Sequence, residues 1–294
     1  MIAPSKLALG TVQFGLAYGA THRGGRVSDA EVEAILARAA AAGIDTLDTA
    51  SAYGESEAVI GQAGSTGFQI VTKTWPVRSP VFDAAAETEV ALRFEQSLVK
   101  LRRARVDALL AHDSQDLLCG GGGRLWALMQ RWKEQGRAGK IGVSVYDADE
   151  LEAVLARFPV EIVQLPLNVL DQRFARSGML AKLQKAGIEA HARSVFLQGL
   201  LLIAPDDTPP RLAHLKPWLR NWQAACAAAG AQPLAAALAF AAGQPGVTRA
   251  VIGVQSAAHL DEVLTAAGAG AALDWGAHAC DDATATDPRR WQRE

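Results

Sequence analysis

Four polar residues stand at the ends of strand-like runs or just beyond them. Asp48 ends the run 44–48, and Tyr53 follows five residues later. Lys73 ends the apolar run 68–73, and His112 comes directly after the run 107–111. Charged lysines are almost never buried without a partner, so Lys73 requires a carboxylate nearby. Polar residues at the carboxyl ends of several strands are typical of an active site in an α/β barrel.

The chemistry that this set predicts is proton donation to a carbonyl oxygen. A phenol has an unperturbed pKa of about 10, so it holds its proton at neutral pH. A nearby ammonium stabilises the phenolate and lowers that pKa, and a carboxylate keeps the ammonium charged. A histidine facing the phenol can orient the carbonyl. Taken singly, Asp48 suits a turn, Tyr53 a half-buried aromatic and His112 a core or loop position.

Short strand-like runs alternate with helical patterns along most of the chain. Apolar residues recur at i, i+3, i+4 and i+7 between the runs, as from Val32 to Ala39. Helix starts are predicted at Ser28, with Glu31 as its capping-box partner, and at Asp147. The candidate strands are residues 7–10, 44–48, 69–73, 107–111, 140–144, 161–165, 188–193 and 249–253.

Strands separated by helices require right-handed crossovers and a parallel sheet. An open dinucleotide-binding sheet would need G-x-G-x-x-G after its first strand, and none is present there. Eight repeated units therefore predict an α/β protein, a (β/α)8 TIM barrel, with residues 1–294 as a single domain. The tail after about residue 267 shows little pattern.

Composition narrows the class of protein. The 294 residues carry a net charge of −2 with no long block of like charge, which argues against nucleic-acid and membrane-surface partners. Three cysteines without a C-x-x-C favour a reduced, cytoplasmic setting and no metal site. The N-terminus lacks the apolar region of a signal peptide. The alanine-rich stretch 223–243 contains Gly230 and Pro233, so we expect two packed helices there.

Motifs from about residue 7 to residue 267 resemble those of the aldo-keto reductases, in the same order. Leu9-Gly-Thr-Val-Gln-Phe-Gly15 is similar to the opening strand and turn of that family. Its most specific signature resembles Ile44-Asp-Thr-Leu-Asp-Thr-Ala-Ser-Ala-Tyr-Gly54 with Glu57. Further similar segments are residues 71–73, 110–112, 140–144, 163–168, 193–201 and 252–262.

The resemblance implies an NAD(P)H-dependent oxidoreductase that reduces an aldehyde or ketone to an alcohol by hydride transfer. Tyr53 would be the general acid, tuned by Lys73 and Asp48, and His112 would position the carbonyl. The implied substrate pocket contains Val12, Phe14 and Trp75. The implied cofactor-binding residues are Gly10, Thr11, Ser144, Gln164, Arg193, Ser194, Leu197, Gly199, Gly253, Gln255, Ser256, His259 and Glu262.

Three positions depart from the family pattern. Val145 stands where many members have asparagine, and Arg193 where many have an aromatic ring that stacks on the nicotinamide. A guanidinium can also stack, but its charge disfavours the oxidised cofactor. Residues 253–262 contain no lysine or arginine to match a 2′-phosphate. NADPH is the expectation from the resemblance, and NADH is the alternative.

Other functions stay open at this point. The same four residues would serve a sugar or aldose dehydrogenase that works in the oxidative direction. A cofactor-binding sensor or auxiliary subunit with slow turnover is a further alternative. A metal-dependent barrel hydrolase would need more histidines at strand ends than the chain offers. The identity of the small-molecule carbonyl substrate and the oligomeric state are not predicted by these patterns.

Overall fold

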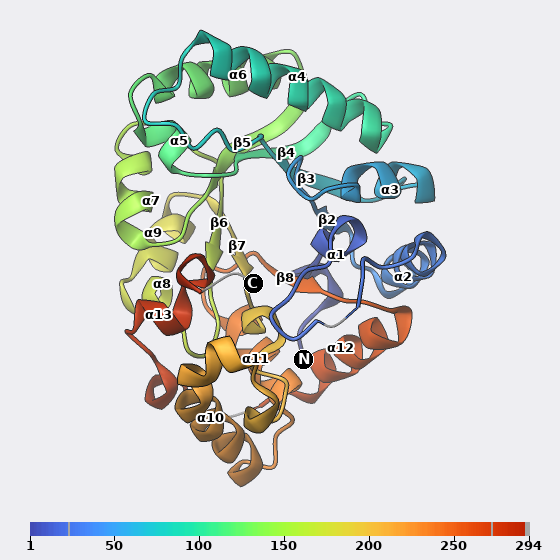
Figure 1. Ribbon diagram of the computed structural model, residues 1–294, viewed down its shortest axis with the longest axis vertical. Coiled ribbons are helices and arrows are strands. Elements are labelled where there is room, and N and C mark those ends of the chain that lie inside the picture. The colour runs from blue at the N-terminus through green and yellow to red at the C-terminus, as the bar shows by residue number, and fades with distance from the viewer. Residues whose placement is uncertain (23, 272, 292–294) are drawn as a thin grey trace.

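Eight short strands form a closed parallel barrel in the order in which they occur in the chain (Figure 1). The computed structural model describes residues 1–294 except 23, 272 and 292–294. The barrel closes where β1 pairs with β8, so the predicted (β/α)8 fold is confirmed. The strands are β1 (Leu7–Gly10), β2 (Thr46–Asp48), β3 (Gln69–Lys73), β4 (Val106–Ala111), β5 (Ala138–Ser144), β6 (Ile162–Pro166), β7 (Glu189–Arg193) and β8 (Arg249–Gly253).

Helices surround the strands on the outside of the barrel (Figure 1). Their apolar stripes are buried against the sheet, as in α2, whose Val32, Ile35, Leu36 and Ala39 are all buried. The helices are α1 (Val12–Gly15), α2 (Asp29–Ala42), α3 (Ser56–Ala63), α4 (Ala84–Leu101), α5 (Gln115–Leu118), α6 (Gly122–Glu134), α7 (Ala148–Leu155), α8 (Arg173–Arg176), α9 (Met179–Lys185), α10 (Lys216–Ala228), α11 (Pro233–Gly243), α12 (Ala257–Ala269) and α13 (Ala283–Thr286).

The helix starts follow the predicted caps. The Ser28 side chain accepts a hydrogen bond from Glu31 N, and Asp147 accepts one from Glu150 N at 2.8 Å. An N-cap of this kind satisfies a backbone N–H that the first turn leaves free. The alanine-rich stretch forms α10 and α11, as predicted. Along the described chain no single helix is long and apolar enough to cross a membrane, although the bent pair Pro210–Ala228 and Pro233–Gly243 passes that test together.

The strand β2 is shorter than its predicted run 44–48. Gly43 ends α2 in the left-handed conformation (φ 84°), and Ile44 N then bonds back to Ala39 O. Ile44 therefore still belongs to the turn that closes the helix, and sheet pairing begins at Thr46. The carboxyl end of the strand is unaffected, so Asp48 ends β2 as expected.

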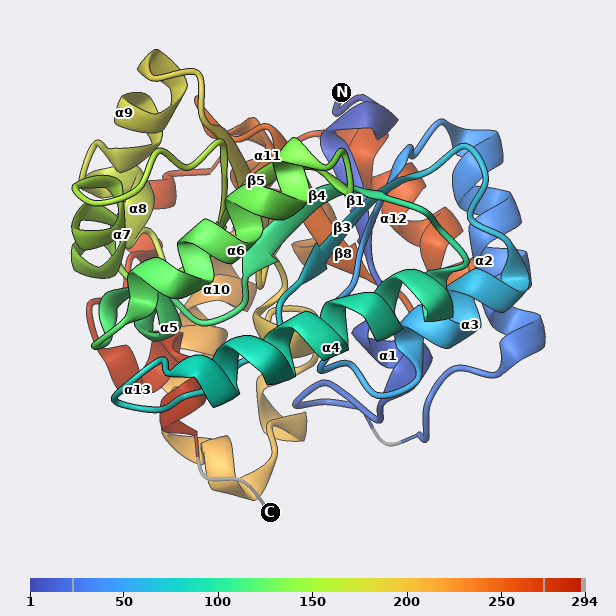
Figure 2. The same ribbon diagram turned by 90° about the horizontal axis from the view of Figure 1, so that it is seen from above.

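Residues beyond α12, where the sequence shows little pattern, form the short elements η5 (Trp275–His278), α13 and η6 (Pro288–Arg290). Cys280 N donates to Leu170 O at 2.8 Å, and Trp291 is buried. We call residues 275–291 the C-terminal segment. Figure 2 shows α13 and α1 on the same face, opposite the N-terminus; α1 directly follows β1, so this face is the carboxyl end of the barrel.

Candidate active site

Lys73 and Asp48 form a buried ion pair at the carboxyl ends of neighbouring strands. Lys73 Nζ lies 2.8 Å from Asp48 Oδ1 and donates a second hydrogen bond to Thr49 O at 2.9 Å. The two side chains are 1% and 5% exposed. Burial lowers the pKa of Lys73, and the Asp48 carboxylate opposes this effect. The carboxylate that the sequence required for Lys73 is therefore present.

Tyr53 and His112 lie beside this pair. Lys73 Nζ is 5.1 Å from the centre of the Tyr53 ring. The Tyr53 and His112 rings meet edge to face, with centroids 5.7 Å apart. His112 N donates to Thr74 Oγ1 at 3.3 Å, which ties the residue after β4 to the residue after β3. The structure thus brings the four predicted residues together.

Burial determines the protonation of both rings. Burial and the nearby Asp48 carboxylate raise the pKa of Tyr53, and Arg193 opposes them. The lowered phenol pKa expected from the sequence is therefore not found here. Burial, with Lys73 and Arg193, lowers the pKa of His112 to about 3. At neutral pH the site holds a protonated phenol and an uncharged imidazole.

The loop that carries Tyr53 packs closely against α1. A Cβ atom on Gly15 would lie 1.9 Å from Tyr53 O and 2.4 Å from Ser56 N, so only glycine fits there. Ser56 Oγ bonds Thr11 O and Thr11 Oγ1, both at 2.9 Å, and Thr11 Oγ1 donates to Asp48 O at 2.9 Å. These buried contacts tie the Tyr53 loop to the ends of β1 and β2. Thr11, predicted to bind cofactor, has a structural role in these contacts.

Glu57, part of the signature around Tyr53, lies behind the Lys73 strand. Thr72 Oγ1 donates to Glu57 Oε1 at 2.6 Å, and the Glu57 side chain is buried. Burial raises the pKa of this carboxyl group, while hydrogen bonds from Thr72 and Ser97 lower it. Glu57 therefore fixes α3 against β3 from the outer side.

Ser144 and Gln164, the predicted carboxamide ligands, are paired in register on β5 and β6. Both are buried. Gln164 Nε2 donates to Asp48 Oδ2 at 2.6 Å across the barrel. Gln164 therefore belongs to the same hydrogen-bonded cluster as Asp48 and Lys73, a link that spacing along the chain does not reveal.

The segment after β7 has an unusual backbone. Ser194, Leu197, Gln198 and Gly199 all have positive φ angles, from 48° to 91°. Turns that mix right- and left-handed residues can direct successive N–H groups into a concave anion site. This conformation fits the predicted contact with a pyrophosphate.

The predicted adenosine end lies where β8 meets α12. Gly253 pairs in register with Gly10 of β1. Ser256 caps α12 and accepts a hydrogen bond from His259 N at 3.0 Å. Gln255 and Glu262 are exposed. Burial lowers the pKa of His259, so this residue adds no cation at neutral pH.

The three predicted pocket residues occupy different surroundings. Phe14 is fully buried in the hydrophobic core. Val12 is half-buried at the start of α1. Trp75 lines a surface depression of about 370 Å³ together with Val81, and the Arg93 guanidinium stacks on its ring at 4.5 Å.

Four residues beside the predicted positions were missed. The Gln13 side chain lies against Gly253, and its Oε1 is buried without a hydrogen-bond partner within the described chain. Glu31 Oε1 accepts a hydrogen bond from Ala257 N at 2.7 Å, at the first residue of α12. The guanidinium groups of Arg193 and Arg289 both lie over the Tyr146 ring. Gln13 and Tyr146 gave a local signal, because Gln13 lies within the motif 9–15 and Tyr146 follows the Ser144 motif. Glu31 and Arg289 come from distant segments.

The described residues contain no cluster of three or more His, Cys, Asp or Glu side chains that could hold a metal ion. The fold places the chain in the class of α/β barrels, with clustered titratable groups at the carboxyl ends of the strands. The model of the Aldo/keto reductase family matches residues 6–271. The chain belongs to this family, whose members use nicotinamide cofactors and small carbonyl substrates.

The individual proteins that this chain resembles differ from it at most positions of the sequence. Aldo-keto reductase YhdN of Bacillus subtilis (strain 168) is 28% identical over 186 residues, which cover 60% of this chain and 54% of that protein. The match thus spans about half the length of this curated relative.

Two solved structures illustrate the shared fold. The holo form of aldo-keto reductase AKR11C1 from Bacillus halodurans has a TM-score of 0.72 at 17% identity, covering 90% of this chain and 87% of that chain. The glycerol dehydrogenase AKR11B4 from Gluconobacter oxydans has a TM-score of 0.67 at 20% identity, with the same coverage of both chains. At these identities the likeness concerns the fold alone.

Proposed function

We propose that this protein reduces an aldehyde or ketone to an alcohol, with Tyr53 as the proton donor. The observation that carries the proposal is the buried pair of Lys73 and Asp48, with Lys73 Nζ 5.1 Å from the Tyr53 ring centre. A buried ion pair is expensive in desolvation and is weak support for stability alone. Beside a phenol, its ammonium has a chemical use, because it stabilises the phenolate that proton donation creates.

The chain's own groups divide the proton chemistry between them. Tyr53 keeps its proton until the substrate oxygen gains negative charge, because burial raises its pKa. Lys73, fixed by Asp48, then faces the phenolate. His112, whose pKa of about 3 keeps it neutral, offers an N–H to the carbonyl oxygen. His112 Nδ1 has no partner within the described chain, so the ring is free to bond a ligand.

A bound nicotinamide cofactor would supply the hydride. Ser144 and Gln164 would hold its carboxamide, and the turn Ser194 to Gly199 would hold its pyrophosphate. Two buried atoms without partners within the described chain, Gln13 Oε1 and His112 Nδ1, support a polar ligand along this path.

Between the two cofactors, the contact of Glu31 favours NADH over the NADPH expected from the resemblance. The Glu31 carboxylate bonds Ala257 N at the start of α12, within the segment proposed for the adenosine end. A carboxylate there uses an N–H that a 2′-phosphate could bind and repels that phosphate. Fluorescence titration with NADH and with NADPH tests this preference; tighter NADPH binding contradicts it.

Replacing Tyr53 by phenylalanine tests the proposed function. We expect kcat/KM with carbonyl substrates to fall on the order of 10²- to 10⁴-fold, because the proton donor is lost. The cofactor Kd stays within about twofold, because a single hydroxyl outside its proposed contacts is removed. Tyr18→Phe, which removes a hydroxyl from an exposed residue, is the matched control. Near wild-type turnover by Tyr53→Phe would show that the assignment is wrong.

A further inference from the structure

Arg193, at the end of β7, is a half-buried cation without a carboxylate partner within the described part of the chain. Its Nη2 donates to Val145 O at 3.1 Å and its Nη1 to Ser194 Oγ at 3.3 Å. Both acceptors are neutral, so these bonds orient the guanidinium without neutralising it. A partly desolvated charge of this kind acts over a longer distance than an exposed one.

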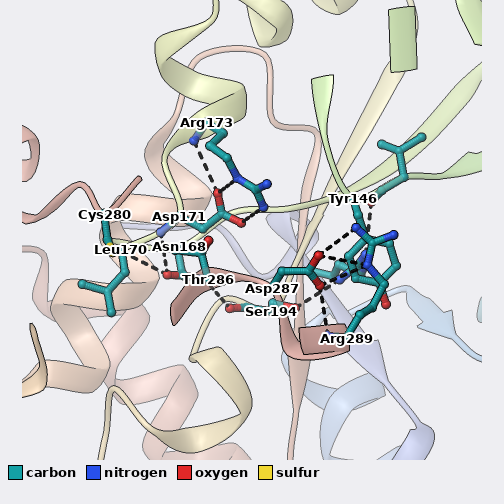
Figure 3. Close-up of polar contacts among 12 residues, drawn as sticks. Tyr146, Asn168, Leu170, Asp171, Arg173, Ser194, Cys280, Thr286, Asp287 and Arg289 are labelled. Atoms are coloured by element: carbon teal, nitrogen blue, oxygen red, sulfur yellow. Dashed lines mark hydrogen bonds and ion pairs between the residues drawn. The ribbon is translucent and has the colours of Figure 1, made fainter. Parts of the chain in front are cut away.

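The guanidinium of Arg193 lies over the ring of Tyr146. Figure 3 shows Tyr146 next to Arg289, the other cation that contacts this ring. The Arg193 Cζ atom lies 4.1 Å from the Tyr146 ring centre, and Arg289 Cζ lies 3.7 Å from it. Arg289 comes from the C-terminal segment and is paired with Asp287 at 2.7 Å and Glu150 at 3.3 Å. The two cations therefore differ: acids match the charge of Arg289 and leave that of Arg193 unmatched.

The unmatched charge acts on the reacting centre. Burial is the largest influence on three pKa values at this centre: it raises that of Tyr53 and lowers those of Lys73 and His112. Arg193, at the carboxyl end of β7, lowers all three, so it opposes burial at Tyr53 and adds to it at Lys73 and His112. The hydride must reach the carbon whose oxygen receives the Tyr53 proton, so the nicotinamide ring must bind beside Tyr53. The charge of Arg193 then also acts on that ring.

We propose that Arg193 makes the cofactor site bind reduced nicotinamide more tightly than oxidised nicotinamide. The inference rests on the proposed function. In the reduction a hydride passes from the ring to the carbonyl carbon and the Tyr53 proton passes to the oxygen, so the charge of the ring rises from zero to plus one. Arg193 repels the charged ring and accommodates the neutral one. Oxidised cofactor then leaves the site more readily than reduced cofactor.

The test is the ratio of Kd values for the oxidised and reduced forms of the same cofactor, measured by calorimetry and fluorescence. The adenosine and pyrophosphate parts are identical in the two forms, so the ratio isolates the ring. In the unaltered protein the Kd of the oxidised form exceeds that of the reduced form. We expect Arg193→Met to lower this ratio of oxidised-form to reduced-form Kd roughly three- to tenfold. Arg193→Lys keeps most of the ratio, because it keeps the charge.

Two further variants separate position from charge. Tyr146→Leu removes the ring that holds Arg193, and it narrows the ratio less than Arg193→Met does. Arg176→Met, a change of equal charge at an exposed residue paired with Asp281, leaves the ratio unchanged. If Arg193→Met raises the Kd of both cofactor forms by the same factor, the inference is wrong but the proposed function is not affected. Absence of any cofactor binding by the unaltered protein overturns the proposed function instead.

Discussion

The two sides of the carboxyl end of the barrel differ in how their charged side chains are paired. On the β2–β4 side, Asp48 and Lys73 are separated by 25 positions in the chain and form a closed ion pair. On the β5–β7 side, Arg193 has neutral neighbours, and the Arg289 that shares Tyr146 with it contacts Glu150 across 139 positions. On the first side the paired residues are close in sequence and their charges cancel. On the second side the contacting residues are far apart in sequence, and the charge of Arg193 is not cancelled.

The difference indicates that the two sides have separate roles. Proton transfer needs a donor whose neighbours are fixed within tenths of an ångström, and a local motif supplies that geometry reliably. Discrimination between charge states of a ligand needs a field instead of a contact, and a single uncompensated guanidinium supplies it. The variants below disturb one side at a time.

The largest effect is expected from opening the ion pair on the β2–β4 side. Lys73→Met leaves the Asp48 carboxylate buried without its cation, which costs about 3–5 kcal/mol of unfolding free energy. Denaturant unfolding measures this loss. Lys182→Met, which opens an exposed pair with Glu152, is the control and changes stability by less than about 1 kcal/mol. Similar losses in both variants would show that burial does not set the value of the Lys73 pair.

A second, smaller effect concerns His191, a buried ionisable group on the β5–β7 side. Both its ring nitrogens lack hydrogen-bond partners within the described chain, and burial lowers its pKa to about 3. The folded protein therefore binds this proton less readily than the unfolded chain, whose histidine has a pKa of about 6.5. Stability is fully present above that pH and is lost as the pH falls from there toward 3.

His191→Leu removes this pH dependence. Between pH 7.5 and pH 5 we expect the unaltered protein to lose about 2 kcal/mol more unfolding free energy than the variant. Denaturant titrations at the two pH values measure the difference. The exposed His214, replaced by leucine, serves as control. Parallel losses in the His191 variant and the unaltered protein would contradict the assignment of a neutral, buried imidazole.

The smallest effect lies outside both sides, at the start of α12. Glu31→Gln keeps an oxygen that can accept the hydrogen bond from Ala257 N and removes only the charge. We expect NADPH to bind roughly two- to fivefold more tightly and NADH to bind as before. Glu33→Gln, an exposed change on the same helix, is the control. Equal shifts for both cofactors would mean that Glu31 does not face the 2′ position.

The sequence predicted the β2–β4 side well for a physical reason. Asp48, Lys73 and His112 lie at or directly after the ends of apolar strands, and parallel strands in a barrel bring such ends to one face. The strand positions themselves follow from buried Val, Ile and Leu runs. The most shortened strand, β2, reflects the turn after Gly43, which depends on backbone conformation and not on hydrophobicity.

The β5–β7 side could be predicted only in part. Arg193 was identified as a departure from the family pattern. Its contact with the Tyr146 ring, and the contact of Arg289 with the same ring, join segments that are distant in the sequence. The C-terminal segment consists of elements of three and four residues, too short to show a helical period. Gln164 was assigned to the cofactor, and its bond to Asp48 across the barrel became visible only in three dimensions.

The pairing of β1 with β8 also has a consequence for folding. Lys6 Nζ bonds Val247 O across 241 positions, so closing this seam brings together segments that are far apart in the chain. Entropy opposes closing so long a loop. Until β8 is in place, β1 and β7 are open sheet edges that can pair with another chain. During refolding we therefore expect closure of the barrel to compete with aggregation. Light scattering at increasing protein concentration would measure the aggregated fraction.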